Sequence, residues 1–298
     1  MLTPPRFSDF PRYPVIAGTL MLATGVTIAK WAGFDVTPLL ASATLRHGQW
    51  WRLVTDILPH GDVLHLVFNL YWMWVFGAVI EESFGHLKTA GLLLLFAIGA
   101  SALEYGFLNG GIGLSGVGYG FFGLLWMLSK YDPEFADAID PRTVQIFLIW
   151  FIFCIVTTVA KIMPVANLAH AGGLILGVLA GLAIGRKDQR VFFAGATALA
   201  FALMVWMATY GRPRVNASGR GGYEEAHLGV QAINAGRNQD AVRWLEDATR
   251  YQPGNANFWQ ILAVAEERAG NHQAALAAME RAQRLQPELA APADDTRP

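Results

Sequence analysis

The sequence is poor in charged residues and in cysteine. Lys, Arg, Asp and Glu make up 15% of the 298 residues, whereas soluble domains carry about 25%. The net charge of −1 provides no basic surface for a polyanion, so we expect no nucleic-acid binding. The single cysteine, Cys154, excludes an internal disulfide and the zinc sites that need several thiolates. This composition argues against an ordinary soluble enzyme.

The charge is distributed unevenly along the chain. Positions 1–211 hold 12 basic and 12 acidic side chains, and the last 87 positions hold 10 and 11. The charge density therefore slightly more than doubles after residue 211, which indicates two parts of different character.

Seven apolar runs fill the first part. A helix needs about 20 mostly apolar residues to cross about 30 Å of hydrocarbon. The runs lie near 13–31, 62–82, 88–107, 115–130, 144–162, 167–185 and 191–210. Seven such helices would require a soluble core too large for this chain to cover. The pattern therefore predicts an all-α polytopic membrane bundle, whose first run is retained because no small-residue cleavage site comes after it.

The distribution of Lys and Arg predicts the orientation. With the N-terminus in the cytoplasm, eight Lys and Arg residues fall in cytoplasmic segments and four on the other side. An odd number of spans would then place the residues after 211 outside the cytoplasm. The basic cluster of Arg212, Arg214 and Arg220 favours the opposite side, so the crossing of the seventh run stays open. We expect a bacterial inner membrane as the location.

Four polar residues begin the even-numbered runs. His65 and Asn69 open the second run, Ser115 the fourth and His170 the sixth. A strongly polar side chain at membrane depth costs about 2–3 kcal/mol, so its presence suggests a function. Alternate spans start at the same membrane face, which brings the four residues to a similar depth. His65 and Asn69 are spaced i, i+4 and share a helix face, although they could simply bond neighbouring helices.

Ser115 comes directly after the glycine-rich loop 108–114, between Gly113 and Gly116. The apolar run that starts at Ser115 has 16 residues, or about 24 Å of helix, so we expect the loop to dip below the membrane surface. Backbone N–H groups at a helix start suit a developing oxyanion. The alternative is a serine that only caps the helix.

Glycines on two runs predict a close helix contact. Gly173, Gly177 and Gly181 recur every four residues, and the fourth run offers a matching stripe of Gly116, Gly120 and Gly123. Close approach would bring His170 to Ser115 as the base that a serine nucleophile needs. No Asp or Glu lies at the outer ends of these two runs, so the pair would be a dyad without a third carboxylate.

Two further observations concern the surroundings of His170. Tyr119 lies one turn after Ser115 and could pack on the imidazole, although an ordinary core aromatic would have the same spacing. A zinc site of His60, His65 and His170 lacks the carboxylate of zinc-protease motifs. We therefore expect neither a metal nor another cofactor.

Several motifs succeed one another between residues 13 and 185. They are Trp51-Arg52, His60, His65-x-x-x-Asn69, Glu81 before Gly85, Gly113-x-Ser115-Gly116 with Tyr119, and Asn167-x-Ala-His170 with Gly173 and Gly177. This series resembles the six-helix core of the rhomboid intramembrane serine proteases.

The resemblance implies roles for the residues of these motifs. Ser115 would be the nucleophile and His170 the general base. The oxyanion hole would consist of His65, Asn69 and the Ser115 backbone N–H. Tyr119, Gly113, Gly116, Asn167 and Gly173 would support the site, and Trp51, Arg52 and Glu81 would be structural.

The implied function is cleavage of transmembrane segments of single-pass membrane proteins within the lipid bilayer. The alternative is a catalytically silent membrane chaperone or adaptor that binds transmembrane helices. An intact serine and histidine favour the protease, since relatives without activity usually lack one of the two.

The second part of the chain contains an internal repeat of 34 residues. Its identities include Gly236/Gly270, Gln239/Gln273, Ala241/Ala275, Glu246/Glu280, Ala248/Ala282, Arg250/Arg284, Gln252/Gln286 and Pro253/Pro287. The pattern resembles tetratricopeptide repeats, which are helix-turn-helix units. Two repeats are fewer than the roughly three that a solenoid normally needs, so we expect the module to rely on a partner, a second copy or a capping segment. Its expected task is to bind a peptide or protein.

The predicted organisation has five parts. They are a six-span core at 1–190, a seventh span at 191–211, a linker at 212–222, two repeats at 223–290 and a tail at 291–298. The Pro-, Ala- and Asp-rich stretch 287–298 is predicted to be disordered.

Overall fold

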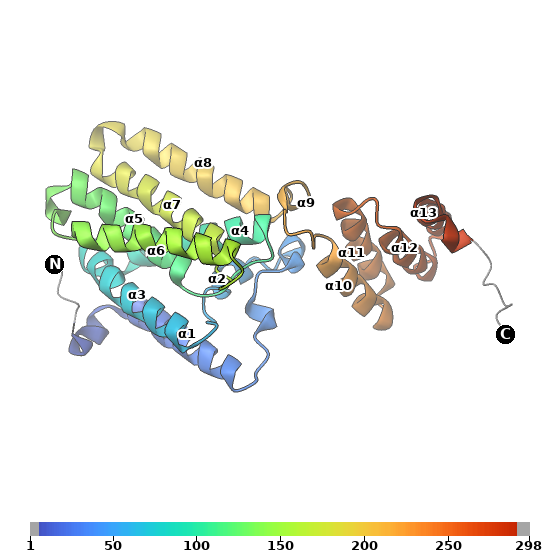
Figure 1. Ribbon diagram of the computed structural model, residues 1–298, viewed down its shortest axis with the longest axis horizontal. Coiled ribbons are helices and arrows are strands. Elements are labelled where there is room, and N and C mark those ends of the chain that lie inside the picture. The colour runs from blue at the N-terminus through green and yellow to red at the C-terminus, as the bar shows by residue number, and fades with distance from the viewer. Residues whose placement is uncertain (1–5, 291–298) are drawn as a thin grey trace. The chain divides into compact units, whose positions relative to one another are not determined.

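The chain folds into helices joined by short loops (Figure 1). The computed structural model describes residues 6–290, and every regular element in that range is helical. The elements in chain order are η1 (Phe7–Arg12), α1 (Pro14–Trp31), η2 (Thr37–Leu39), η3 (Ala43–His47), α2 (Arg52–Thr55), α3 (Val63–Phe84), α4 (His86–Phe107), α5 (Ser115–Tyr131), η4 (Pro133–Phe135), α6 (Pro141–Val159), α7 (Asn167–Gly185), η5 (Lys187–Gln189), α8 (Arg190–Ala208), α9 (Arg212–Val215), α10 (Tyr223–Asn234), α11 (Asn238–Tyr251), α12 (Ala256–Arg268), α13 (His272–Leu285) and η6 (Pro287–Ala290).

The described residues form two compact units, which divide after Arg212. We call residues 6–212 the membrane unit and residues 213–290 the tail unit. In the described part of the chain, six helices are long and apolar enough to cross a membrane: α1, α3, α4, α6, α7 and the helical stretch Lys187–Ala208. The fourth predicted run, 115–130, forms α5, whose 17 residues span only about 26 Å. Each of the seven predicted runs thus forms a helix in the described part of the chain, and the one that begins at Ser115 is short, as the sequence predicts.

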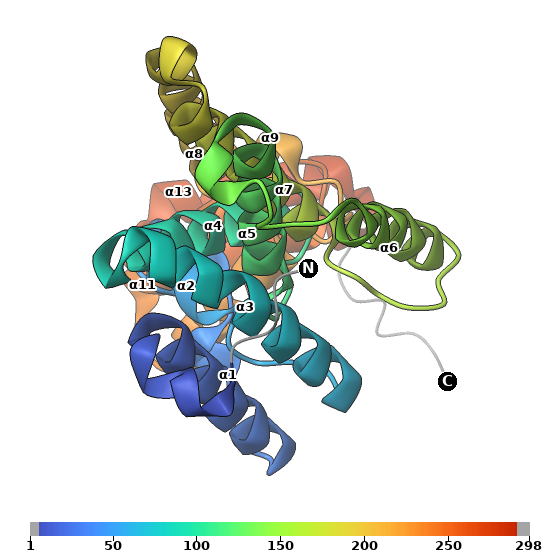
Figure 2. The same cartoon turned by 90° about the vertical axis from the view of Figure 1, so that its left-hand side faces the viewer.

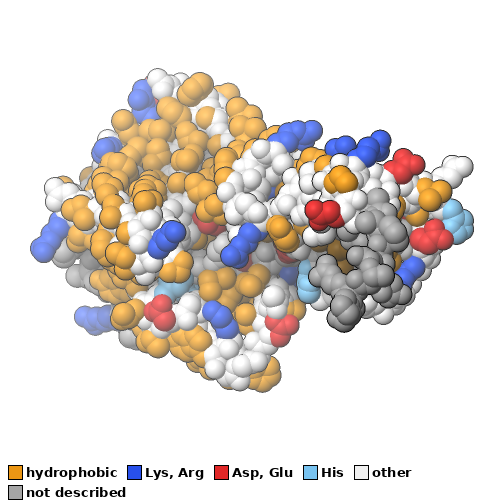
Figure 3. Space-filling model, turned by 45° about the vertical axis from the view of Figure 1, so that its right-hand side comes forward, with side chains coloured by type: hydrophobic (Ala, Val, Ile, Leu, Met, Phe, Trp, Pro, Cys, Tyr) orange, Lys and Arg blue, Asp and Glu red, His pale blue; other side chains and the backbone are white. Residues whose placement is uncertain are grey.

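The bundle presents apolar side chains outward. Figure 3 shows hydrophobic side chains over much of the membrane unit in that view. On α8, Val191, Phe192 and Leu199 are exposed, and only 11% of the apolar window of its span is buried. A surface of this kind suits contact with lipid.

The closest helix contact joins α5 and α7, which lie side by side in Figures 1 and 2. A Cβ added to Gly173 would lie 1.9 Å from the carbonyl oxygen of Gly116, and one added to Gly177 would lie 2.1 Å from that of Gly120. No side chain fits at either position, so the backbones touch directly. The close approach predicted from the two glycine stripes is thus present.

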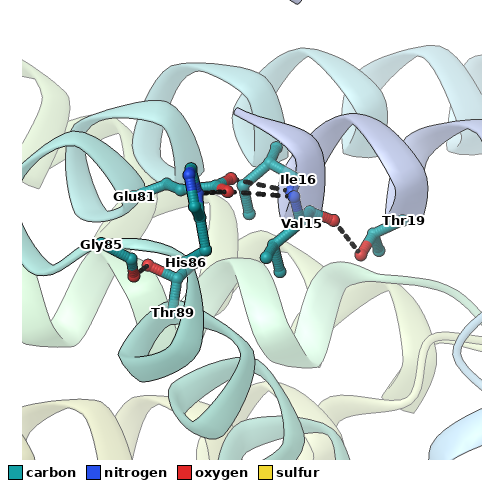
Figure 4. Close-up of polar contacts among 7 residues, drawn as sticks. All are labelled: Val15, Ile16, Thr19, Glu81, Gly85, His86 and Thr89. Atoms are coloured by element: carbon teal, nitrogen blue, oxygen red, sulfur yellow. Dashed lines mark hydrogen bonds and ion pairs between the residues drawn. The ribbon is translucent and has the colours of Figure 1, made fainter. Parts of the chain in front are cut away.

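A buried carboxylate ties α1 to α3 at the end of the bundle opposite Ser115 (Figure 4). The two oxygens of Glu81 accept the backbone N–H groups of Val15 and Ile16 at 3.0 and 2.9 Å, and Glu81 also contacts His86 Nδ1 at 2.6 Å. The first N–H groups of a helix have no partner within it. Glu81, which is 2% exposed, satisfies two of them at the start of α1.

A buried arginine ends the membrane unit. Arg212 is 3% exposed, and its guanidinium lies 3.9 Å from the centre of the Tyr105 ring. It donates through Nε to the Tyr105 carbonyl at 3.0 Å and through Nη2 to the Leu108 carbonyl at 3.3 Å. Cations suit the negative end of a helix, so Arg212 holds the end of α4, where the loop to Ser115 begins.

The tail unit contains two helix pairs, α10 with α11 and α12 with α13. The bounds of α13 are those of α11 shifted by 34 residues, and the turn glycines Gly236 and Gly270 both have a positive φ, of 71° and 85°. The sequence repeat is therefore a structural repeat of helix pairs. Residues 287–290 form η6 although their composition predicts disorder, and the predicted disordered tail 291–298 lies outside the described residues.

We expect Gly173→Ala to destabilise the membrane unit, because its methyl group would overlap the Gly116 carbonyl. Overpacking of this kind costs about 1–3 kcal/mol. Gly118→Ala, also on α5, is the matched control because its Cβ would meet nothing within 4 Å. Thermal unfolding of the detergent-solubilised protein should give a lower midpoint for the first variant only. Equal midpoints would contradict the tight helix contact.

Candidate active site

Ser115 and His170 meet at the starts of α5 and α7. Ser115 is the first residue of α5, and His170 lies in the first turn of α7. The Ser115 Oγ and His170 Nε2 atoms are 2.8 Å apart, and His170 is 4% exposed. This distance is short enough for a hydrogen bond through which a proton could pass from the hydroxyl to the imidazole.

Two features hold the His170 ring. The ring stacks on that of Tyr119, with 4.6 Å between the ring centres and an interplanar angle of 29°. Tyr119 is fixed in turn, because its hydroxyl donates to the Phe147 carbonyl at 3.1 Å. The other imidazole nitrogen, Nδ1, is buried and has no hydrogen-bond partner among the described residues. No carboxylate therefore contacts the imidazole in the described part of the chain.

The loop before Ser115 requires glycine at position 113. Gly113 has a φ of 105°, and a Cβ there would lie 2.7 Å from His65 Nε2. His65 Nδ1 accepts the Gly61 N–H at 3.3 Å, so the proton of a neutral ring must be on Nε2. His65 thus turns an N–H donor toward the loop that carries the serine.

His60 supports the same loop. Its Nε2 accepts the backbone N–H of Leu114 at 3.3 Å, and its Nδ1 lies 3.0 Å from the Leu58 carbonyl. The first contact requires a neutral ring. Burial, with a smaller effect of His65, lowers the pKa of His60 to about 4, which keeps this ring neutral near pH 7. His60 therefore fixes the residue directly before Ser115.

The other predicted site residues make contacts around the dyad. The Asn69 side-chain amide donates to the His65 carbonyl at 2.8 Å, within its own helix. Asn167 donates to Thr158 Oγ1 at 2.9 Å and so ties the start of α7 to the end of α6. A Cβ on Gly116 would lie 2.6 Å from that of Ala100. The hydrogen bonds of the Asn69 and Asn167 amides do not involve Ser115.

A small cavity of about 20 Å³ lies beside Ser115. Its lining includes Asp56, Ser101 and Glu104. Asp56 Oδ1 accepts the Ser101 hydroxyl at 2.6 Å, while Oδ2 is buried without a partner among the described residues. Burial raises the pKa of Asp56 to about 8, so its carboxyl group is mostly protonated at neutral pH. The volume and these few polar side chains suit one water molecule.

The sequence analysis did not identify Glu104. Its Oε2 accepts the backbone N–H groups of Leu168 and Ala169, each at 3.0 Å. An ionisable residue inside the predicted run 88–107 was the available signal. The starts of the even-numbered runs do not reveal it, because Glu104 lies near the end of an odd-numbered run, which reaches the same membrane face.

No group of three or more His, Cys, Asp or Glu residues in the described range 6–290 is arranged to hold a metal ion. The three histidines considered for zinc have other partners. His60 and His65 pack edge to face with ring centres 4.8 Å apart, and His170 contacts Ser115.

Comparisons with known proteins agree on one family. Residues 47–187 match the family model described as the Rhomboid domain. Rhomboid protease GlpG of Yersinia pseudotuberculosis serotype I (strain IP32953) is 33% identical over 174 residues, which cover 57% of this chain and 59% of that protein. The GlpG of Photorhabdus laumondii is 34% identical over 141 residues, covering 46% and 48%.

Rhomboid protease GluP of Bacillus subtilis (strain 168) is 26% identical over 254 residues, covering 83% of this chain and 48% of that protein. The chain thus spans between 48% and 59% of the length of these three relatives. Together the matches support the rhomboid family of proteases. With the apolar helices, they also support a multi-pass integral membrane protein.

We expect His60 to make the membrane unit sensitive to acid. Its folded pKa of about 4 lies below the ordinary 6.5. The stabilisation from the neutral ring is therefore complete above about pH 6.5 and is lost as the pH falls through about 4. Thermal midpoints of detergent-solubilised protein should fall less steeply between these pH values in His60→Gln than in the wild type. Parallel pH profiles would contradict this assignment.

Proposed function

We propose that the protein is an intramembrane serine endopeptidase that cleaves transmembrane segments of other membrane proteins. The observation that carries the proposal is the 2.8 Å contact between Ser115 Oγ and His170 Nε2 at the starts of two packed helices. The relatives named rhomboid proteases support the same reaction class.

The reaction begins with attack of Ser115 Oγ on the carbonyl carbon of the scissile peptide bond. His170 Nε2 takes the hydroxyl proton and returns it to the leaving amine as the C–N bond breaks. Water then attacks the resulting ester, with His170 again as the base, and the serine is released. The cavity beside Ser115 offers a place for that water near the ester.

Three donors are available for the oxyanion that forms in each step. They are His65 Nε2–H, the backbone N–H of Ser115 and the Asn69 amide. The amide has two N–H groups, of which only one is needed for its bond to the His65 carbonyl. The second can therefore point to the substrate. Donors preorganised in a site of low dielectric stabilise charge far better than they would in water.

The N-terminus is proposed to be cytoplasmic and the tail unit extracytoplasmic, in a bacterial inner membrane, from the distribution of Lys and Arg. We also propose that Lys187–Ala208 is an additional span beyond a six-helix core that includes the short α5. Cleavage would then occur near the outer leaflet, where the loop before Ser115 lies.

The tail unit is proposed to be a pair of tetratricopeptide-like repeats that binds a protein or peptide. Two observations support this. The helix pairs repeat with an offset of 34 residues, which is the length of that repeat. The match to GluP covers 83% of the chain and so must extend past residue 212 into the tail unit.

Replacement of the nucleophile tests the reaction. We expect Ser115→Ala to abolish both cleavage of a transmembrane substrate and labelling by a fluorophosphonate, because no other hydroxyl contacts His170 among the described residues. The matched control is Ser129→Ala at the far end of α5, whose hydroxyl only bonds the Trp126 carbonyl. Labelling that persists in Ser115→Ala would refute the proposal. A folded wild-type protein that neither cleaves nor reacts would instead favour the chaperone or adaptor.

Removal of one N–H donor tests the proposed oxyanion hole. We expect Asn69→Ala to reduce kcat by about 10²–10³-fold, with little change in KM, because the amide serves the transition state and not the ground state. Steady-state cleavage of a fluorogenic transmembrane peptide measures both constants. An unchanged kcat would exclude Asn69 from the oxyanion hole.

A further inference from the structure

Two buried glutamates in the membrane unit make the same kind of contact. Glu81 accepts the backbone N–H groups of Val15 and Ile16 at the start of α1 (Figure 4). Glu104 accepts those of Leu168 and Ala169 at the start of α7. The two glutamates are 2% and 3% exposed. Each therefore fixes the first turn of another helix through two consecutive backbone groups.

The physical reason for the contact is the same in both places. N–H groups in the first turn of a helix have no partner inside that helix, and burying one unpaired costs about 1–3 kcal/mol. A carboxylate is a strong acceptor and also suits the positive end of the helix dipole. Because one oxygen of Glu104 accepts both N–H groups, the contact limits the position and the rotation of the α7 start.

Glu104 differs from Glu81 in its proximity to the dyad. Its partner Ala169 directly precedes His170, so Glu104 holds the backbone from which the imidazole projects. It also adjoins the serine loop, since a Cβ on Gly111 would lie 3.5 Å from Glu104 Cγ. The Glu81 contact joins α1 to α3, whereas the Glu104 contact holds Ala169, whose carbonyl oxygen would lie 3.3 Å from a Cβ on Gly116.

The His170 ring needs such a constraint from its backbone. In a serine-histidine-aspartate triad, the third carboxylate bonds the far imidazole nitrogen and orients the ring. Here that nitrogen, Nδ1, has no partner among the described residues. Stacking on Tyr119 fixes the plane of the ring, but a stacked ring can still slide along its neighbour. The position of the α7 backbone must therefore set the Ser115–His170 distance.

We propose that Glu104 is the positioning residue of the general base. It performs the orienting task of a third carboxylate by holding the backbone before His170, and it does not touch the imidazole. This inference rests on the proposed protease function, because it assigns Glu104 a role in keeping Ser115 Oγ and His170 Nε2 at reactive distance.

The test compares full-length Glu104 and Glu81 variants in detergent micelles, with fluorophosphonate labelling rate, kcat, KM and thermal midpoint as readouts. We expect Glu104→Ala to lower kcat and the labelling rate by about 10–100-fold with KM nearly unchanged, since a misplacement of about 1 Å can cost 10²-fold. Glu104→Gln should recover most of the activity, because its amide oxygen can still accept both N–H groups. Glu81→Ala loses the same type of contact far from the dyad and should keep kcat at a comparable loss of thermal midpoint.

Glu104→Asp keeps the charge but shortens the side chain, and it serves if the alanine variant does not fold. Its kcat should fall below that of Glu104→Gln, because the side chain must be long enough to accept the two N–H groups of α7 and need not be charged. Wild-type kcat in Glu104→Ala or Glu104→Asp, or an equal loss of kcat in Glu81→Ala, would overturn the inference. Failure of the proposed function is a different result, since wild-type protein itself would then not react with the fluorophosphonate.

Discussion

The backbone contact between α5 and α7 determines where the serine and the histidine lie. The carbonyl oxygens of Gly116 and Gly120 on α5 lie where side chains at Gly173 and Gly177 of α7 would otherwise project. The backbones of the two helices are therefore in direct contact. Dispersion forces act over short distances and grow with the number of touching atoms, and small residues at such an interface allow the largest contact. Ser115 and His170 both lie at the same end of this contact. Their 2.8 Å separation is therefore a consequence of helix packing.

A second constraint comes from backbone groups that have no partner in regular structure. Helix ends and the serine loop leave such groups in an apolar setting, where water cannot satisfy them. The membrane unit meets this need with buried polar side chains. His60 accepts from Leu114, Glu104 from Leu168 and Ala169, and Arg212 donates to the end of α4. Each of these residues also fixes a segment next to the dyad. The same side chains therefore provide partners for buried backbone groups and position the site.

Much of the architecture could be predicted from the sequence, because hydropathy reports lipid contact directly and glycine spacing reports close packing. The helix starts at Ser115 and Asn167 and the 34-residue repeat of the tail unit agree with such local patterns. Glu104 could not be assigned in this way, because its partners are backbone N–H groups and no residue type marks them. The hydrogen bond from the Leu114 backbone N–H to His60 could not be predicted for the same reason. The η6 turn, where composition predicts disorder, depends on packing that composition does not encode.

The position of Arg212 affects how a force on the tail unit would act on the membrane unit. Pro213, the first residue of the tail unit, is covalently joined to Arg212, whose side chain is locked onto the end of α4. A force on a chain segment ordinarily acts on the helix to which that segment is directly joined, here α8. Because Arg212 also bonds the end of α4, a force on residue 213 would act on α4 as well, and α4 is the helix that supplies Glu104. The anchorage thus connects the first residue of the tail unit to the helix that carries Glu104.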